Sequence, residues 1–487
     1  MPPIAVSVRS GAPEESSADT RVIGLFEGEP PAGDALRSLV DSGEAKSAPR
    51  KLAVAHEAGA NGASRRVILV GLGKRDELDA ERARVAAAVA TARARELGAR
   101  SLSWALPDPG VAAALVEGTV LALYEFDRFK SAKDPDAPDG RIESLELVGS
   151  GDSVAGDAER ARVIAEAQNG ARDLQNLPSN VATPAFLAER SVALAEAHPP
   201  LSCEVLDRGQ VAALKMGAFS AVAQGSDTEP KLIVLRYEGG GSGPHLGYVG
   251  KAVTFDTGGI SIKPSGKMQE MKFDMSGGAA VIEALGAIAT LELPVRITAV
   301  VPATENMPSG HSMKPGDIVT AMNGKTIEVN NTDAEGRLIL ADALAYAVDQ
   351  GAERIVDLAT LTGAIIVALG STYAGLFSND DGWYAEVEGA CRTTGELGWR
   401  LPLHPEYFEL TKGRYADLTN ASEQRKASSI YAAEFLRQFV DDRPWVHVDI
   451  AGTAWDQSGR PYVGSGASGF GVRMLVELAR RTGEAEH

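Results

Sequence analysis

The chain has 487 residues, 44% of them hydrophobic and 23% charged, which is ordinary for a soluble globular protein but more than one hydrophobic core normally supports. We therefore expect two domains. The 48 lysines and arginines are outnumbered by 66 aspartates and glutamates, and the formal charge of -18 repels phosphate backbones and anionic membranes. General nucleic-acid binding is disfavoured, and a local basic patch stays open as an alternative.

Further features of the sequence bear on the cellular compartment. Cys203 and Cys391 match no zinc or redox spacing, so we expect no structural disulfide and a reducing environment. The first residues, MPPIAVSVRSGAPEE, contain neither a basic leader nor a sustained apolar segment. The uncharged run 358–377 is long enough to span a bilayer, but its threonines, serine and glycines favour a buried strand, a turn and a short helix. The sequence thus predicts a cytoplasmic protein without a membrane span.

Residues 1–155 are expected to form a small N-terminal α/β domain. Strand-like runs (IAVSV, RVIGLFE, RRVILVGLG, LSWAL and IESLELVG) alternate with Ala-rich helical runs at 77–97 and 110–126. Gly71-Leu72-Gly73 suggests a dinucleotide-binding loop, but Asp76 stands where a third glycine is needed, so a tight turn is the better interpretation. A Gly- and Ser-rich stretch marks the boundary, and we expect a linking helix at 156–176.

Residues 177–487 are expected to form a larger α/β domain. The runs KLIVLRYE, HLGYVGKAVTFD, VRITAVVPA, RIVDLATLT and WVHVDIAG are almost continuously apolar, as is typical of strands covered by helices on both faces. We predict a mostly parallel sheet with a site at the carboxyl ends of its strands, where Asp256, Asp333 and Thr360 fall. His447, on an apolar strand, is expected to be a hydrogen-bonded core residue.

Charged residues interrupt the apolar pattern in GKAVTFDTGGISIKPSGKMQEMKFDMSGGAA, residues 250–280. Lys251 and Asp256 lie on the predicted strand, where burying a charge is costly unless something pairs with it. Lys263 follows in a loop punctuated by Gly and Pro, and Asp274 precedes the small-residue run that starts a helix. Taken separately, these are a lysine reaching out from a strand edge, a turn aspartate and a helix cap. Their joint occurrence favours a common purpose.

A second acidic stretch, VNNTDAEGRLIL at 329–340, joins a strand-like run to a helical one. Asp333, Glu335 and Arg337 occupy alternate positions, and in an extended segment this spacing sends their side chains to one side. By itself the stretch is more typical of a solvated helix start. Together with the first stretch it predicts a cation site, because closely packed carboxylates repel each other unless a cation lies between them.

The usual signatures of other hydrolases are missing from the sequence. There is no HExxH motif, since His56-Glu57 has no second histidine, and no CxxC pair or GxSxG elbow. Hydrolysis would therefore depend on the oxygen-rich site, whose four carboxylates balance two divalent cations: Asp256, Asp274, Asp333 and Glu335. Lys251 can ligate only as a neutral amine, a form that burial and adjacent cations favour.

The two acidic stretches also resemble a known family. GKAVTFDTGGISIKP, MKFDMSGGAAV and NTDAEGRL are similar to three active-site signatures of the leucyl aminopeptidase family, the di-metal cytosolic aminopeptidases. The similarity continues in order through RDLQNLPSNVATP, LATLTGA, AGLFSND, HVDIAGTAW and GASGFGVRML, and so covers 172–475. The octapeptide NTDAEGRL is a highly specific marker. The resemblance implies a macro-like assembly domain, a di-metal catalytic domain and a homohexamer.

The resemblance also implies roles for individual residues. Two divalent ions, manganese or zinc, would be held by Lys251, Asp256, Asp274, Asp333 and Glu335, and a metal-bridging hydroxide would attack the scissile carbonyl. Lys263 would stabilise the oxyanion, and Arg337 would hold a bicarbonate ion as proton shuttle. Peptide substrates with a large aliphatic N-terminal residue such as leucine would contact Met271, Thr360, Leu361, Gly363 and Ala451. For Met271, ordinary core filling is an equal alternative.

The stretch EQRKASS at 423–429 departs from the family, which usually has a glycine-containing loop there. Such a change can alter substrate access or subunit contacts.

Two other hypotheses for the whole chain stay open. A two-metal phosphoesterase is compatible with the carboxylates, although the motifs contain no basic grip for a phosphate. A DNA-binding regulator is known among similar proteins, although the acidic composition opposes it.

Overall fold

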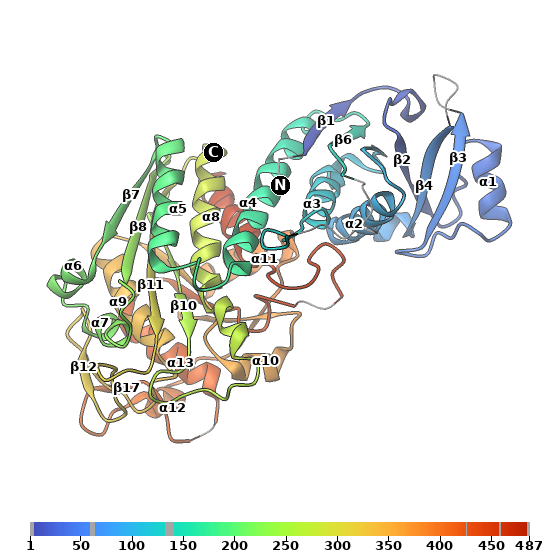
Figure 1. The fold of residues 1–487 in the computed structure, drawn as a ribbon. Helices are drawn as coiled ribbons and strands as arrows, with labels where there is room; N and C mark the ends of the chain where they lie inside the picture. Colours follow the sequence, from blue (N-terminus) through green and yellow to red (C-terminus); the bar gives the residue numbers. More distant parts are fainter. Residues whose placement is uncertain (1–3, 59–63, 132–140, 425, 457–458, 485–487) are drawn as a thin grey trace. The chain divides into compact units, whose positions relative to one another are not determined.

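The computed structural model describes residues 4–58, 64–131, 141–424, 426–456 and 459–484. It confirms the expected α/β fold with two domains. The chain divides into two compact units (Figure 1): Met1–Asn169 with Gly459–Gly464, and Gly170–Ser458 with Ser465–His487. The division falls within helix α4, Val154–Asn176, which includes the whole segment 156–176 predicted as a linking helix.

The first unit is a six-stranded sheet with helices on both faces. Its strands lie in the order β1-β6-β5-β2-β4-β3, and all neighbours are parallel except β3 and β4. The strands are β1 Ala5–Arg9, β2 Thr20–Phe26, β3 Leu52–Ala58, β4 Ser64–Gly73, β5 Ser101–Ala105 and β6 Ser144–Val148. The helices besides α4 are α1 Asp34–Asp41, α2 Ala80–Glu96 and α3 Ala112–Ala122. Strand β3 was not among the predicted strands.

Strand β4 shows how alternation divides the core of this unit. Ile68, Val70 and Leu72 belong to the cluster that contains residues of α2 and α3. Val67 and Leu69 point the other way, into a smaller cluster with residues of α1. Because successive side chains of a strand face opposite sides, one apolar run supplies both clusters.

The second unit contains a nine-stranded mixed sheet in the order β16-β15-β18-β14-β9-β11-β8-β7, with β10 paired to β11. Its strands are β7 Leu201–Leu206, β8 Lys231–Glu238, β9 Leu246–Gly250, β10 Ala252–Asp256, β11 Arg296–Asn306, β14 Arg354–Ala359, β15 Ala374–Ser378, β16 Gly398–Arg400 and β18 Trp445–Asp449. A second sheet contains β12 Ile318–Thr320, β13 Thr326–Glu328 and β17 Leu418–Thr419. The central neighbours β18-β14-β9-β11 are parallel, as predicted, whereas β7 and β8 are antiparallel to their neighbours. Strand β15 is antiparallel to β18 and parallel to β16.

Helices cover both faces of this sheet. They are α5 Pro184–Ala197, α6 Arg208–Ala213, α7 Gly217–Ala223, α8 Ser276–Thr290, α9 Gly336–Asp349, α10 Gly363–Leu369, α11 Asp381–Thr394, α12 Pro405–Phe408, α13 Ser428–Leu436 and α14 Val472–Glu484. Helices α5, α8, α11 and α14 contact one another and the sheet, and α7, α9 and α13 form the second layer (Figure 1). The uncharged run 358–377 resolves into the end of β14, α10 and the start of β15, and no described helix is long and apolar enough to cross a membrane.

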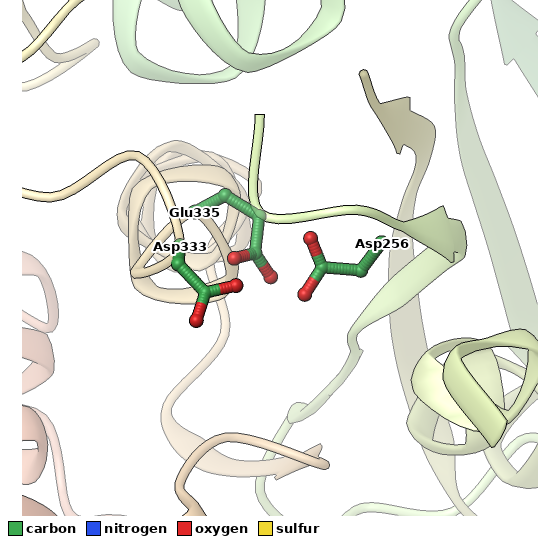
Figure 2. A group of neighbouring side chains, drawn as sticks. All are labelled: Asp256, Asp333 and Glu335. Carbon is green, nitrogen blue, oxygen red and sulfur yellow. The ribbon is translucent and has the colours of Figure 1, made fainter. Parts of the chain in front are cut away.

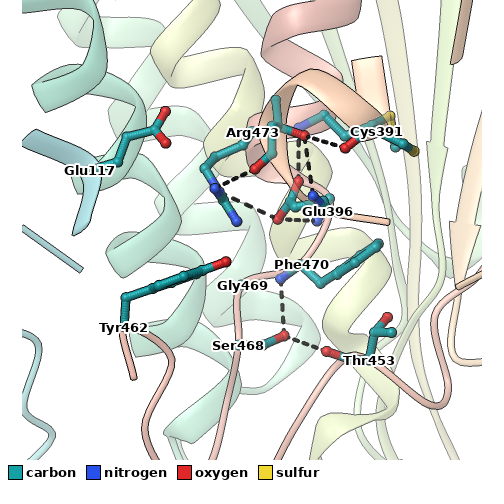
Figure 3. Close-up of polar contacts among 12 residues, drawn as sticks. Glu117, Cys391, Glu396, Thr453, Tyr462, Ser468, Gly469, Phe470 and Arg473 are labelled. Carbon is teal, nitrogen blue, oxygen red and sulfur yellow. Dashed lines mark hydrogen bonds and ion pairs between the residues drawn. The ribbon is translucent and has the colours of Figure 1, made fainter. Parts of the chain in front are cut away.

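The start of helix α8 is fixed by close backbone packing, and the start of helix α14 by a buried carboxylate. A Cβ on Gly277, in the first turn of α8, would lie 2.0 Å from the carbonyl oxygen of Leu358 on β14, so only glycine allows this approach. Figure 3 shows Glu396 next to Arg473, which lies in the first turn of α14. The Glu396 carboxylate accepts from the N–H groups of Gly471, at 3.0 Å, and Met474, at 2.8 Å. A carboxylate at a helix N-terminus satisfies donors that lack partners within the helix.

Candidate metal centre

Three carboxylates converge where β10 ends and α9 begins. Asp256 is the last residue of β10, Asp333 lies in the turn before α9, and Glu335 is the residue just before that helix. Each offers an oxygen within 4.8 Å of the others, and Figure 2 shows the three carboxylates pointing toward one another. Asp256 and Glu335 are buried, and Asp333 is half-buried.

The segment that supplies Asp333, Glu335 and Arg337 is not extended, so that part of the prediction was wrong. Residue 335 already has helical backbone angles, and α9 starts at Gly336. The carboxylates of Asp333 and Glu335 approach each other from a turn and a helix start, and Arg337 lies in the first helical turn with separate partners.

Lys251 is brought to the cluster by a break in a strand. The run HLGYVGKAVTFD was predicted as one strand, but it forms β9 and β10, with Lys251 between them. Its Nζ lies 2.8 Å from an oxygen of Asp274 and 2.9 Å from Glu335, and it donates to the carbonyl oxygen of Thr360 at 3.1 Å. Asp274, on the 3-10 helix Met268–Met275, also accepts from the Thr360 hydroxyl at 2.7 Å.

Lys263 closes the other side of the cluster. Its Nζ lies 2.7 Å from Asp256 and forms an even shorter ion pair with Asp333. The second oxygen of Asp256 accepts from the N–H of Gly258 at 2.9 Å and from the side-chain amide of Asn306 at 2.8 Å. The two lysines therefore lie between different pairs of carboxylates.

Burial and charge shift the protonation of these groups in opposite directions. Burial alone would lower the pKa of Lys251, but the carboxylates of Asp274, Glu335 and Asp256 outweigh it and raise the pKa above its usual range. The same balance raises the pKa of Lys263. Burial raises the pKa of Asp333 to about 6, against the attraction of Lys263, and raises that of Asp274 well above its usual value.

The residues fit a group of divalent cations. Four carboxylates with two ammonium groups leave two negative charges uncompensated in a buried place, which is unfavourable without further cations. Carboxylate oxygens suit hard cations such as manganese, and a neutral amine is a possible additional ligand. The structure thus brings together all five residues expected as ligands: Lys251, Asp256, Asp274, Asp333 and Glu335.

Arg337 lies apart from the carboxylates, in contact with the segment that leads into α13. It is 5% exposed, donates from Nη1 to the carbonyl oxygen of Asn420 at 2.6 Å, and lies 5.2 Å from the centre of the Tyr431 ring. Its Nε is buried and has no hydrogen-bond partner in the described part of the chain. A buried guanidinium with a spare donor fits a small planar anion.

The residues expected to contact substrate lie mainly on one segment. Thr360 follows β14, Leu361 is half-buried, and Gly363 opens α10 on the exposed surface. Leu361 and Ala451 pack against the same apolar cluster. Met271 is half-buried on the 3-10 helix, and we find no hydrogen bond in the described ranges that ties it to the other four.

Two residues that hold this site in place, Asn306 and Asp449, were not among the predicted site residues. Asn306 ends β11, is 2% exposed, and donates to both Asp256 and the carbonyl oxygen of Thr332. Asp449 ends β18 and accepts from the backbone of Leu361 and Ala451. Both are single polar residues that end apolar strands. In the sequence, only that position could have indicated that they belong to the site. His447 is confirmed as a core residue, since its Nδ1 lies 2.6 Å from a buried oxygen of Asp357.

An α/β sheet with carboxylates clustered where a strand ends and a helix begins fits a metal-dependent hydrolase. The model of the cytosol aminopeptidase family, catalytic domain, matches residues 169–476, and that of the N-terminal domain of the same family matches residues 22–133. The chain belongs to the cytosol aminopeptidase family, and the resemblance found in its signatures is confirmed. It is a metal-dependent aminopeptidase.

Individual relatives agree with this assignment. A probable cytosol aminopeptidase of Solibacter usitatus is 45% identical over 95% of this chain and 96% of its own length. One of Roseiflexus castenholzii is 44% identical over 98% and 99%. Among solved structures, the bottromycin maturation enzyme BotP in complex with Mn has a TM-score of 0.87 and 34% identity, covering 96% of this chain and all of that one (100%).

Proposed function

We propose that the enzyme removes the N-terminal residue from peptides, with leucine and other large aliphatic residues preferred, at a centre of two divalent cations. The ligands are Lys251, Asp256, Asp274, Asp333 and Glu335. The observation that carries the proposal is the convergence of Asp256, Asp333 and Glu335, two of them buried, each with an oxygen within 4.8 Å of the others. The relatives named as probable cytosol aminopeptidases support peptides as substrates and the cytoplasm as the location of the enzyme.

Lys251 can act as a ligand only once cations are bound, because its amine must first lose a proton. Its pKa is raised by neighbouring carboxylates, against the lowering effect of burial. Divalent cations neutralise those carboxylates, so that burial becomes the larger influence and the neutral amine is favoured. Lys263 is only partly buried, so burial lowers its pKa less than that of Lys251. We expect the Lys263 amine to stay protonated.

Bound divalent cations activate water and polarise the scissile carbonyl. The chain's own contribution to the developing negative charge is Lys263, whose ammonium group is fixed between Asp256 and Asp333. A preorganised cation in a water-poor site stabilises an oxyanion without reorganisation during the reaction. We therefore assign the stabilisation of the tetrahedral oxyanion to Lys263.

Arg337 is proposed to hold bicarbonate as the proton shuttle. None of the site residues is a histidine or an unpaired carboxylate suited to act as general base. The free Nε of Arg337, next to the Nη1 that binds Asn420, offers a buried donor to a planar carbonate-like anion. The anion would accept a proton from the attacking water and pass it to the leaving amine.

The preference for leucine rests on the apolar surroundings of the substrate segment. Leu361 and Ala451 belong to one apolar cluster, and Thr360 lies next to Lys251 and Asp274. The apolar surface at Leu361 therefore directly follows Thr360, which bonds to two of the proposed ligands. Manganese is favoured over zinc by the neighbour with bound Mn, and a homohexamer stays a proposal from the family.

The proposed function is tested by removing and restoring the metal. Chelated protein is assayed for release of leucine from a leucyl anilide, before and after addition of manganese or zinc. We expect the added metal to restore activity in the wild type and not in Glu335→Gln. Glu328→Gln is the matched control, because Glu328 is also buried but accepts from the backbone of Arg414 and Tyr415, at 2.8 and 2.5 Å. An inactive but folded wild type with every metal, or a fully active Glu335→Gln, contradicts the proposal.

A further inference from the structure

The end of strand β18 carries a buried carboxylate that the proposed chemistry does not use. Asp449 is fully buried, and its Oδ1 accepts from three backbone N–H groups: Leu361 at 3.1 Å, Ala451 at 3.2 Å and Thr362 at 3.4 Å. Its Oδ2 accepts from the hydroxyl of Thr362 at 2.6 Å. One carboxylate thus joins the segment after β14 to the segment after β18, the two places where substrate contacts are expected.

Thr362 extends this arrangement to a third element. Its hydroxyl lies 2.6 Å from the hydroxyl of Ser429, in the first turn of α13, and accepts from the N–H of Ile365 at the start of α10. A hydroxyl has one proton, and an ionised carboxylate can only accept. When Asp449 is ionised, Thr362 donates to it, and Ser429 must then donate to Thr362. The order Ser429 to Thr362 to Asp449 is therefore determined.

The neighbouring residue ties the same segment to the proposed cation site. Thr360 accepts from Lys251 through its carbonyl oxygen and donates to Asp274 through its hydroxyl. The segment 360–363 is thus fixed at one end by the proposed ligands and at the other by Asp449. Without Asp449, three buried N–H groups would lose their acceptor, and such groups are rarely left unpaired in folded proteins.

We propose that Asp449 is a positioning residue for substrate selection, which sets the backbone at 361–363 and 451 with the help of Thr362 and Ser429. The inference rests on the proposed function, since it assigns the recognition of the N-terminal side chain to this segment. Asp449 does not contact the reacting atoms. Its carboxylate determines where Leu361 and Ala451 place the apolar surface against which an aliphatic side chain packs.

Asp449→Asn and Thr362→Val test the proposal. An asparagine keeps an oxygen for the three N–H groups but offers Thr362 an amide donor in place of an acceptor, so the hydrogen bond from Thr362 to a charged carboxylate is lost. We expect KM for a leucyl anilide to rise about tenfold, the effect of losing one hydrogen bond to a charged group. We expect kcat to change less, because neither Lys263 nor Arg337 bonds to Asp449, and the preference for leucyl over alanyl anilide to fall. Thr362→Ser keeps the hydroxyl and should retain the wild-type KM.

Asp342→Asn is the matched control. Asp342 is also fully buried and accepts from two backbone N–H groups, Phe219 at 2.8 Å and Met322 at 2.7 Å, away from the segment 360–363. A purely structural role would make this variant and Asp449→Asn alike, with lower stability and an unchanged KM. The proposal is overturned if Asp449→Asn and Thr362→Val keep KM and selectivity within about twofold of wild type, or if Asp342→Asn shifts KM equally.

Hydrogen exchange supplies a readout that needs no activity. The backbone amides of 361–363 should exchange faster in Asp449→Asn than in the wild type, and should be unchanged in Asp342→Asn. Unchanged exchange at 361–363 in Asp449→Asn refutes the positioning role whatever the activity. A wild type that is inactive on every N-terminal substrate, with faster exchange in the variant, refutes the proposed function and leaves the anchoring intact.

Discussion

Replacing Asn306 with alanine should weaken metal binding without removing a ligand. The Asn306 amide donates to Oδ1 of Asp256 at 2.8 Å and to the carbonyl oxygen of Thr332 at 3.0 Å. In Asn306→Ala, Asp256 keeps only the donor from Gly258 on that oxygen, and the buried carbonyl of Thr332 loses its partner. The orientation of the carboxylate toward Asp333 and Glu335 is then held by Gly258 and Lys263 alone among the described residues.

The magnitude follows from these two contacts. A hydrogen bond to a charged group contributes about 1.5–3 kcal/mol, and an unpaired buried carbonyl costs about 1–3 kcal/mol. Partners that orient a metal ligand typically contribute about 10–100-fold to metal affinity. We therefore expect the manganese concentration that half-restores activity to rise about 10–100-fold in Asn306→Ala.

The assay is a titration of chelated enzyme with manganese, followed by hydrolysis of leucyl anilide and by the amount of bound metal. Asn379→Ala is the control, because the Asn379 amide donates to the carbonyl oxygen of Arg443 and accepts from the N–H of Trp445, both at 2.9 Å, with no carboxylate involved. An unchanged midpoint for Asn306→Ala, or an equal shift in Asn379→Ala, would refute the role of the amide in orienting Asp256.

Three further predictions follow from single contacts. Lys263→Met should lower kcat about 10²–10³-fold, which is the usual effect of losing a group that stabilises the oxyanion. The amount of bound metal, measured by mass spectrometry, should be retained, because removing the ammonium group makes the carboxylate cluster more negative. Ala427→Gly should raise the free energy of unfolding by up to about 1 kcal/mol in denaturant titrations, because Ala427 has a φ of 50° in the left-handed region; a lower value would contradict the strain. Burial raises the pKa of Asp342 from 3.8 to about 7, so its contribution to stability is complete below pH 3.8 and is lost as the pH rises through about 7. Unfolding at several pH values should show the stability of wild type relative to Asp342→Asn falling over this window, and a constant difference would exclude the shift.

The proposed ligands could be predicted because each is an exception to a local rule. Lys251 and Asp256 put charge on an apolar run, and burial in the structure explains why such residues need partners. Glu335 and Asp333 were predicted to meet Asp256, and they do, but through a turn and a helix start instead of an extended segment. The alternating spacing therefore correctly predicted that Asp333 and Glu335 lie close together, but the backbone there is not extended, and Arg337 lies apart with separate partners.

Asn306 and Asp449 could not be predicted in the same way, because their partners are distant in the chain. Asn306 meets Asp256 across a separation of 50 residues, and Asp449 meets Leu361 across 88. Each lies at the end of an apolar strand, a position that is polar in many sheets without any special purpose. Which strand ends become neighbours is set by the order of the strands, and that order depends on packing throughout the sheet.

The stretch 423–429, which departs from the family, leads into helix α13 next to the proposed site. Ala427 precedes α13 with left-handed backbone angles that glycine adopts at little cost, so the alanine is strained at this position. Two residues later, Ser429 meets Thr362, and Tyr431 lies against Arg337. The start of α13 thus touches both the substrate segment and the proposed anion site. Thr360 ties the same segment to Lys251 and Asp274, so a shift of α13 would move the Thr362 end of the segment relative to the proposed ligands at its Thr360 end.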